Sequence, residues 1–486
     1  MIDEVDAVVV GAGPNGLTAA VTLARAGVEV RVYEGAATVG GGASTQELTL
    51  PGFRHDVCSA VHPLGAGSPA FRAMPLGQYG LDWVQPPLPL AHPFPGGSAV
   101  VLARSAEETA ASLHGDGRRY RRLIAPFLGR WDGLAPDVLR APLAIRPRHP
   151  ALLARFGARA VAPAALLARL FRGERARGLL AGLAAHGVAP LGSPVTGGIA
   201  VLFALAAHEV GWPFPRGGSQ ALSEALAAYL RHLGGQIHTG HPVSSLDDLP
   251  PARVYLLDVM PERLADLAEG RLPHRYVQRL RRYRHGPGVF KVDYALSAPV
   301  PWTAPACTLA GTVHLGPSFA EIDTALRAAY RGEAPATPFL IVAQPSLFDS
   351  SRAPDGGQVL WVYGHVPHGW RGDLTAAIER QIERFAPGFR DLILVRSIAG
   401  PAQIQARNPN NAGGDIAGGA CDRLRLLFRP TAARVPYATP NPDIYLCSSA
   451  TPPGPGVHGM CGYHAAQLAA RRMFGMTPAE RTVKGE

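Results

Sequence analysis

The chain has 486 residues, of which 47% are hydrophobic and 7% aromatic, and its net charge is +10. This length exceeds one simple core, so we expect two domains, and the composition excludes extended disorder. The five cysteines are odd in number and lack metal-ligand spacing, which favours reduced thiols and predicts neither a disulfide framework nor a metal site. Because no signal peptide precedes the first expected strand, we expect a cytoplasmic protein.

The first 33 residues have the pattern of a βαβ unit. Residues 5–10 are a short apolar run typical of a buried parallel strand, residues 14–26 have helical spacing, and residues 28–33 read as the second strand. Gly27 is expected to end the helix. The unit is therefore expected to begin a Rossmann-type α/β domain.

A GxGxxG fingerprint fills the turn between the first strand and the helix, and it consists of Gly11, Ala12, Gly13, Pro14, Asn15 and Gly16. The glycines allow a tight turn, close backbone approach to a pyrophosphate and close helix–strand packing. The helix N-terminus offers free N–H groups to the phosphates. Glu34 ends the second strand, where its carboxylate suits the adenosine ribose hydroxyls and disfavours a 2′-phosphate. The pattern predicts a bound dinucleotide.

Two further glycine-rich segments favour FAD over NAD alone. Gly40 precedes a loop placed like the second glycine-rich loop of glutathione-reductase-type flavoproteins, with candidate contacts Gly41, Gly42 and Ala43. Residues 451–459 stand before a final helix expected at 461–473, with candidate contacts Gly456, Val457 and Gly459. The N-terminus of that helix would stabilise the negative charge that a flavin gains on reduction.

The middle of the chain alternates between strand and helix patterns. We expect a hairpin over 82–102, mostly helices over 104–185, a helix over 217–233 and a strand-rich region over 288–365. Residues 178–208 contain no Asp, Glu, Lys or Arg. Pro190 and Pro194 break this stretch, so buried helices lining an apolar cavity are favoured over a membrane span.

Arginine is concentrated between Arg118 and Arg177, where 14 Arg stand against only three acidic residues. Such a region fits an anionic membrane surface, an acidic carrier protein, an anionic substrate, or simply solvated helix faces. Nucleic acid is not expected, because aromatic residues are not interleaved with the arginines. The membrane alternative would make the protein peripheral to a membrane. The sequence does not determine the oligomeric state.

The chain resembles the phytoene desaturase/carotenoid dehydrogenase-like family of flavoproteins, in the branch of pyridine nucleotide-disulfide oxidoreductase domain proteins. The matching segments are 11–17, 51–63, 214–219, 411–416 and 445–462. The resemblance implies a glutathione-reductase-type Rossmann FAD domain with an inserted mixed α+β substrate domain. It divides the chain into an FAD domain of residues 1–80, 215–285 and 435–486 and a substrate domain of residues 81–214 and 286–434. It also implies a backbone contact from Val243 to the adenine.

The resemblance implies a dehydrogenase, desaturase or oxidase that moves a hydride to FAD but does not imply phytoene as substrate, and the uncharged stretch 178–208 favours a mostly apolar small molecule of polyene or acyl type. Flavin carries out the hydride transfer, so the protein mainly positions substrate and handles a proton. The candidate catalytic residues are His55, His62, His458 and Tyr463. A histidine there suits a proton acceptor, and equally a loop histidine bonded to backbone. Asp415 is as readily a turn-capping residue as a substrate contact.

Three alternatives remain open. A redox-neutral FAD-dependent isomerase would leave the substrate mass unchanged. A non-catalytic lipid-binding escort, as in Rab GDP-dissociation inhibitors, would not explain why the glycines of the fingerprint and Glu34 are all present. An NAD-only dehydrogenase leaves residues 451–459 unexplained.

Overall fold

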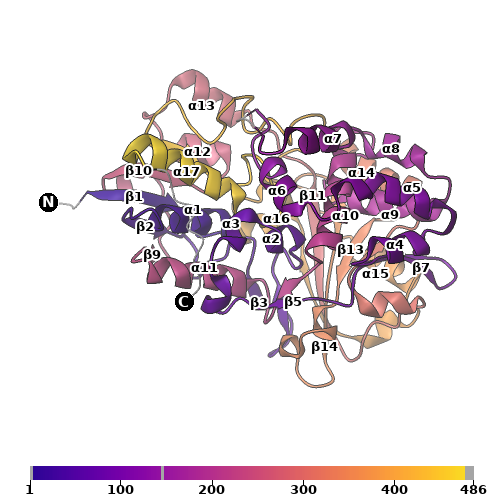
Figure 1. Ribbon diagram of the computed structural model, residues 1–486. Coiled ribbons are helices and arrows are strands. Elements are labelled where there is room, and N and C mark those ends of the chain that lie inside the picture. The colour runs from indigo at the N-terminus through magenta and orange to yellow at the C-terminus, as the bar shows by residue number, and fades with distance from the viewer. Residues whose placement is uncertain (1–3, 144–146, 477–486) are drawn as a thin grey trace.

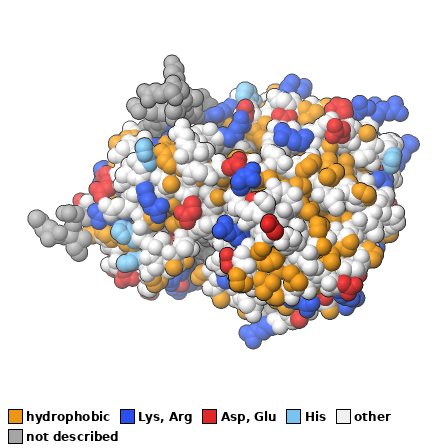
Figure 2. Space-filling view, turned by 90° about the horizontal axis from the view of Figure 1, so that it is seen from below, with side chains coloured by type: hydrophobic (Ala, Val, Ile, Leu, Met, Phe, Trp, Pro, Cys, Tyr) orange, Lys and Arg blue, Asp and Glu red, His pale blue; other side chains and the backbone are white. Residues whose placement is uncertain are grey.

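The computed structural model describes residues 4–143 and 147–476. A parallel sheet with its helices forms one side of the molecule, and a larger sheet covered by a layer of helices forms the other (Figure 1). Seen from below (Figure 2), the surface mixes charged and hydrophobic side chains, and the hydrophobic ones gather mainly on the half that contains the larger sheet.

Five parallel strands make the first sheet, in the order β16-β10-β1-β2-β9. Their bounds are β1 (Val5–Val10), β2 (Val30–Tyr33), β9 (Gln236–His238), β10 (Ala252–Leu257) and β16 (Ile444–Leu446). The chain therefore returns to this sheet twice after long excursions. The expected glutathione-reductase-type α/β fold is confirmed.

Helices cover both faces of this sheet. Successive side chains of β1 point to opposite faces, so this strand contributes residues to two separate cores. Ala7 and Val9 belong to a core with α1, α11 and α17, whereas Val8 and Val10 pack on the opposite side with α12 and α13. The bounds of these helices are α1 (Pro14–Ala24), α11 (Gln220–His232), α12 (Pro261–Leu267), α13 (His274–Arg281) and α17 (Met460–Phe474).

The second sheet has seven strands in the order β15-β11-β14-β13-β12-β6-β7, antiparallel except for the parallel pair β12–β6. Their bounds are β6 (Leu88–Phe94), β7 (Ser98–Leu102), β11 (Gly288–Leu296), β12 (Ala310–Leu315), β13 (Leu340–Ala343), β14 (Gln358–Val366) and β15 (Ile393–Ala399). The central strands β11 and β14 are buried along almost their whole length. Two short antiparallel pairs lie outside these sheets, β3 (Thr45–Glu47) with β4 (Arg54–Asp56) and β5 (Trp83–Val84) with β8 (Phe214–Pro215).

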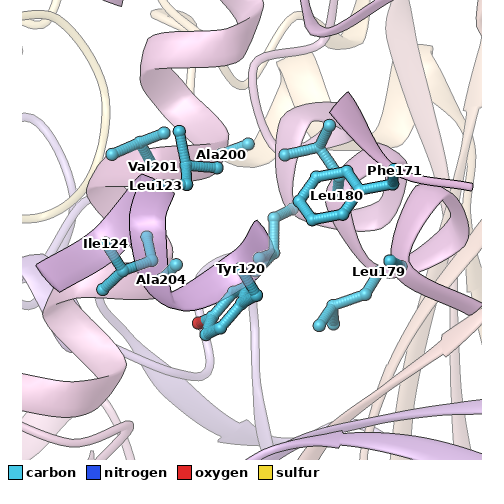
Figure 3. Close-up of a pocket in the computed structure, with 11 residues that line it drawn as sticks. Tyr120, Leu123, Ile124, Phe171, Leu179, Leu180, Ala200, Val201 and Ala204 are labelled. Atoms are coloured by element: carbon cyan, nitrogen blue, oxygen red, sulfur yellow. The ribbon is translucent and has the colours of Figure 1, made fainter. Parts of the chain in front are cut away.

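One face of the seven-stranded sheet carries most of the helical layer, and α15 (Thr375–Glu383) packs on the other face. The remaining helices are α2 (Pro63–Ala66), α3 (Pro69–Arg72), α4 (Ala106–Ser112), α5 (Gly117–Ile124), α6 (Trp131–Val138), α7 (Pro150–Ala160), α8 (Ala164–Leu167), α9 (Glu174–Ala185), α10 (Thr196–Glu209), α14 (Phe319–Arg331) and α16 (Pro401–Arg407). The helical layer is densely packed: between α5, α9 and α10 a small pocket of about 10 Å³ is lined by residues such as Tyr120, Leu179 and Ala204 (Figure 3). That is room for about one water molecule.

The uncharged stretch 178–208 forms most of α9 and α10, as expected. The strand-rich expectation for 288–365 missed one helix, α14. Ser318 caps this helix by accepting the backbone N–H of Glu321 at 3.1 Å, a local pattern that the sequence displays. Within the described residues, every single helix falls short of the length and apolar content needed to cross a membrane, whereas the pair Pro150–Ala160 and Ala164–Leu170, bent by 90°, meets both criteria.

Candidate active site

A cavity of about 1050 Å³ lies between the two domains and is lined by both. From the parallel-sheet domain come Gly11, Gly13, Pro14, Asn15, Glu34, Gly41, Gly42, Val243, Asp258, Gly456, Val457 and His458. From the substrate domain come Phe156, His186, Ile199, Phe203, Trp212, Lys291, Ile341, Trp361, Tyr363 and Ile404. One continuous space therefore joins the predicted dinucleotide loops to an apolar, aromatic chamber.

The turn between β1 and α1 admits only glycine at two of its positions. Gly11 has φ +99°, and a Cβ on Gly16 would lie 2.0 Å from the carbonyl oxygen of Gly11. The N-cap Gly13 leaves the first turn of α1 without a side-chain cap. Asn15 has a buried carboxamide oxygen without a hydrogen-bond partner. The turn thus offers backbone N–H groups to a phosphate, whereas the carboxamide oxygen of Asn15 is an acceptor and can bond only to a donor.

Glu34 lies at the end of β2 and lines the cavity. Its Oε2 accepts the backbone N–H of Ala12 at 2.6 Å, and its Oε1 accepts that of Ala36 at 2.9 Å. These bonds orient the carboxylate, and each oxygen keeps a lone pair for a ribose hydroxyl. Val243 also lines the cavity, and its carbonyl oxygen accepts a hydrogen bond from Arg263 Nη2 at 2.8 Å.

Of the other predicted FAD contacts, three lie behind the cavity wall. Ala43 is buried, with its N–H bonded to the carbonyl of Gly40 at 2.8 Å. A Cβ on Gly459, the N-cap of α17, would lie 2.3 Å from Thr18 Oγ1, so this glycine serves helix packing. Gly16 has the helix-packing role that the fingerprint predicts.

His458 is the predicted catalytic histidine that lines the cavity. Burial lowers its pKa to about 4, so the ring is neutral near pH 7. Its Nδ1 accepts the backbone N–H of Met460 at 3.1 Å, which assigns the ring proton to Nε2. That Nε2 has no partner among the described residues. Nε2 is itself buried, and the backbone of Pro455 and Gly454 lies close enough to oppose the effect of burial on the pKa of His458, so this donor belongs to the cavity wall.

His55, His62 and Tyr463 do not line the cavity. His62 Nε2 bonds to Ser219 Oγ at 2.8 Å, and His55 Nε2 bonds to Thr49 Oγ1 at 2.7 Å. Burial lowers the pKa of His62 to about 4 and that of His55 to about 3. The hydroxyl of Tyr463 accepts from Gln467 on the same helix.

Asp415 caps its own loop, as its turn context suggested. It is fully buried and accepts the backbone N–H groups of Gly286 at 2.7 Å, Ala417 at 2.8 Å and Gly419 at 3.0 Å. Its Oδ2 also lies 3.6 Å from Nδ1 of His285, and although Ile416 and Ala417 next to it line the cavity, Asp415 itself does not.

Lys291 is a cavity residue that the sequence interpretation did not single out. It lies on β11 with a 3% exposed side chain and forms an ion pair with the buried Asp293, two residues along the same face. Its Nζ is 5.9 Å from the ring centroid of Trp361, whose Nε1 donates to the carbonyl of Cys58. Burial lowers the pKa of Lys291 and raises that of Asp293. The sequence offered one clue to Lys291, which is a single lysine within a mostly apolar strand.

Asp258 is the second cavity residue that was not singled out from the sequence, and it follows β10 directly. Burial, with a contribution from the charge of Glu34, raises its pKa to about 7. A Cβ on Gly13 would lie 3.0 Å from its Oδ2. The phosphate-binding turn therefore contains a carboxyl group that is close to half protonated near neutral pH.

Beneath the loop 57–61 lies a network of buried charges and hydroxyls. Arg352 Nη2 donates to Asp56 Oδ2 at 2.8 Å, and both side chains are at most 1% exposed. Asp56 also accepts the backbone N–H of Ser219, whose hydroxyl donates to the carbonyl of Ser59 at 2.6 Å. The network fixes a loop that faces both Gly42 and Lys291.

The comparisons with known proteins agree with this geometry. A family model described as an NAD(P)-binding Rossmann-like domain matches residues 9–74. "Pyridine nucleotide-disulfide oxidoreductase domain-containing protein 2" of Rattus norvegicus is 26% identical over 97% of this chain and 94% of its own length. A "zeta-carotene-forming phytoene desaturase" of Myxococcus xanthus is 28% identical over 74% of this chain and 72% of its own length.

Solved structures share the fold. A putrescine oxidase variant has a TM-score of 0.61 at 19% identity, covering 97% of this chain and 99% of its own. The cyclohexylamine oxidase of Brevibacterium oxydans has a TM-score of 0.56 at 15% identity, and the match covers 97% of this chain and 99% of the oxidase. A Rab GDI of Plasmodium falciparum has a TM-score of 0.52 at 10% identity, and the match covers 98% of this chain and 99% of the Rab GDI.

Fold, cavity and relatives define the class: this is an FAD-dependent oxidoreductase with a Rossmann-type dinucleotide domain. Within that class the chain is similar over 97% of its length to pyridine nucleotide-disulfide oxidoreductase domain-containing protein 2 and over 74% of its length to a phytoene desaturase. The resemblance stated from the sequence is thereby confirmed. The glycine turn, Glu34 and the second glycine loop fit an FAD, whose phosphates and ribose need these groups.

Proposed function

We propose that this protein is an FAD-dependent dehydrogenase or desaturase that removes a hydride from an apolar substrate of polyene or acyl type. The observation that carries the proposal is the single cavity that joins the dinucleotide turn to a chamber walled by Phe156, Phe203 and Trp212. When bound, FAD supplies the hydride acceptor. The residues of the chain exclude water, orient the substrate and hold the proton that leaves with the hydride.

The charges on the cavity wall favour an apolar substrate over an amine. The described acidic residues that line the cavity are Glu34 and Asp258, both at the dinucleotide turn. A substrate ammonium in the chamber would therefore lack a carboxylate on that wall, and burying an unpaired charge is costly. His186, which lines the chamber and bonds to His314 Nε2 at 2.9 Å, is neutral because burial lowers its pKa to about 3.

Lys291 and Asp293 are proposed to handle the proton. Burial shifts their pKa values toward each other, so the pair changes protonation at lower cost than a solvated pair would. Lys291 reaches the cavity, whereas Asp293 stands behind it. His55, His62 and Tyr463 remain weaker candidates, since other residues separate them from the cavity.

A redox-neutral isomerase would use the same cavity, and a lipid escort would use the chamber alone. Anaerobic incubation of the FAD-loaded protein with long-chain acyl compounds, polyenes and amines separates these functions. We expect bleaching of the flavin absorption by an acyl compound or polyene and no bleaching by amines. Bleaching by amines alone would overturn the substrate class. Conversion of a substrate without bleaching and at unchanged mass would replace dehydrogenation by isomerisation.

A further inference from the structure

A row of side chains crosses the floor of the substrate chamber from β11 to β12. Lys291 of β11 is directly opposite Tyr363 of β14, and Tyr363 is directly opposite Ile341 of β13. Ile341 is in turn opposite His314 of β12. Directly opposed residues share one face of a sheet, and three strand spacings place His314 roughly 14 Å from Lys291. Among the described residues, none of β6 or β7 lines the cavity, so the chamber ends at β12.

Buried histidines fill the layer between this end of the sheet and α9. His314 is fully buried, and its Nε2 lies 2.9 Å from Nε2 of His186, which lines the chamber. Gly182 of α9 makes room for the His314 ring, because a Cβ there would lie 2.4 Å from Nδ1 of that ring. Gly178, one turn earlier, makes room for His92, since its Cβ would lie 2.9 Å from Nε2 of His92. The surface of α9 therefore fits these rings.

The proton positions in the His186–His314 pair follow from the surroundings of His314. Burial lowers the pKa of His186 to about 3 and that of His314 well below its usual 6.5, so each neutral ring carries one proton. Nδ1 of His314 is buried without a partner in the described chain, and an N–H in that position would be costlier than a bare nitrogen. The proton of His314 therefore belongs on Nε2, which donates to Nε2 of His186.

His186 then carries its own proton on Nδ1. This atom bonds to no described residue and is not among the enclosed atoms, so it is open to the cavity that His186 lines. His186 therefore presents a neutral N–H donor to the chamber.

Thr312 supplies a second neutral donor, two residues before His314 on the same face of β12. It is 2% exposed and lines the cavity. Its Oγ1 accepts the Nε1–H of Trp212 at 2.9 Å, and no described residue accepts the hydroxyl proton of Thr312. Trp212 also meets the ring of His186 edge-on, with the ring centroids 6.1 Å apart. Both donors therefore lie beside Trp212 at one end of the chamber.

The charges at this end indicate which chemical group it binds. The lysine and arginines that line the cavity lie outside α9 and β12, and they are Arg140, Arg263, Lys291 and Arg407. A carboxylate at the two donors would therefore be buried without a counterion, which is costly. An ammonium would face donors instead of acceptors, and a hydrocarbon would leave both donors unpaired. A neutral oxygen acceptor avoids all three costs.

We propose that His186 and Thr312 bind a carbonyl oxygen of the substrate, across the chamber floor from Lys291. The inference rests on the proposed dehydrogenase function and narrows its substrate to a long apolar chain that carries a ketone, aldehyde or ester group. His314 positions His186 through the bond between their Nε2 atoms, and Trp212 positions Thr312. A few placed polar groups in an apolar chamber orient a ligand that hydrophobic contact alone would leave free to slide.

Competition between ligands for the FAD-loaded, oxidised protein tests the site without turnover. The ligands are an unbranched long-chain methyl ketone and the alkane, fatty acid and primary amine of the same length, each displacing a fluorescent apolar probe. We expect the ketone to bind at least about tenfold more tightly than the other three. Equal affinity of ketone and alkane would overturn the proposal and leave the donors to an ordered water. Tighter binding of the acid would overturn the assignment to a neutral oxygen.

Two variants remove the donors while approximately keeping the shape of the side chains. His186→Phe and Thr312→Val should each lower ketone affinity about 3–10-fold and not weaken alkane binding. Phe156→Leu is the matched control, because it trims an apolar wall residue and should weaken both ligands alike. Equal losses of ketone and alkane in both donor variants would make these residues structural and overturn the proposal. Flavin content verifies folding, and Thr312→Val decides the matter if His186→Phe does not fold.

The infrared carbonyl stretch of an isotopically labelled ketone reports the hydrogen bonds directly. In the parent protein it should lie at lower frequency than in an alkane solvent, and each donor variant should move it back toward the solvent value. A solvent-like stretch in the parent would overturn the proposal. Because none of these measurements needs flavin reduction, their failure leaves the proposed redox function intact. A flavin that no substrate bleaches would instead remove that function and leave the binding site.

Discussion

Asp258 Oδ2 accepts the backbone N–H of Gly16 at 2.9 Å, inside the turn that is predicted to receive the dinucleotide phosphates. The acid thus occupies the positive end of α1, the position that favours an anion. Its pKa of about 7 results chiefly from burial, which outweighs the bond from Gly16. A carboxyl group and a pyrophosphate in one small turn make the protonation of Asp258 and the binding of FAD interdependent.

FAD affinity should therefore depend on pH. Since the phosphates favour the neutral acid, the affinity is highest below pH 7 and falls as pH rises through the pKa of Asp258, by up to about tenfold per pH unit. Asp258→Asn keeps the acceptor for Gly16 and should remove this dependence. Titration of the apoprotein with FAD across pH 6 to 9, followed by flavin fluorescence, provides the measurement. An unchanged pH dependence in the Asn variant would sink the assignment.

Lys291→Met should destabilise the protein by about 3–5 kcal/mol, because it removes the cationic partner of the buried Asp293 and leaves only the neutral ring of His55, 3.7 Å away, beside that carboxylate. Lys291→Met/Asp293→Asn should recover most of that loss while FAD still binds. The rate of flavin reduction should stay at least about a hundredfold low in both variants, as expected for loss of a proton acceptor. Denaturant unfolding and anaerobic stopped-flow reduction give the two readouts. If the double variant restored the rate as well as the stability, the role of Lys291 would be structural only.

Gly16→Ala should weaken FAD binding about 10–100-fold, because its Cβ would collide with the Gly11 carbonyl 2.0 Å away and open the turn. Gly157→Ala is the matched control, since a Cβ there meets no atom within 4 Å and Ala favours its helix. Calorimetric titration with FAD measures both. Parent-like affinity in Gly16→Ala would show that the turn is not where the phosphates bind.

Arg352→Met should cost about 3–5 kcal/mol of unfolding free energy, since Asp56 would lose its buried partner. Burial raises the pKa of Asp56, but Arg352 together with hydrogen bonds from Ser219 and Thr45 outweighs burial and holds this pKa below its usual 3.8. A lowered folded-state pKa gives stability that is present above pH 3.8 and lost as pH falls through the folded-state value. As pH falls below 7, the free energy of unfolding should therefore decrease more steeply in the parent protein than in Asp56→Asn. Chemical denaturation between pH 2 and 7 checks both expectations.

The dinucleotide side of the site was predictable because its chemistry is local. A strand, a glycine turn and a helix follow one another in the chain, so Gly11, Gly13 and Glu34 could be assigned a role from spacing alone. The substrate side was not predictable in the same way. Lys291 gains its importance from Trp361 and the loop at Cys58, which are distant in sequence, and Asp258 meets Gly16 across 242 residues. His55 and His62 lie in a matching motif, but the motif serves the Asp56–Arg352 network instead of the cavity wall.

The most direct test of the central claim is a single anaerobic turnover of the FAD-loaded protein with an apolar substrate, followed both by flavin absorption and by product mass. We predict that one equivalent of flavin is bleached and that the product has lost two hydrogen atoms. Protein that binds the same compound while its flavin stays oxidised and the compound's mass stays unchanged would contradict the account.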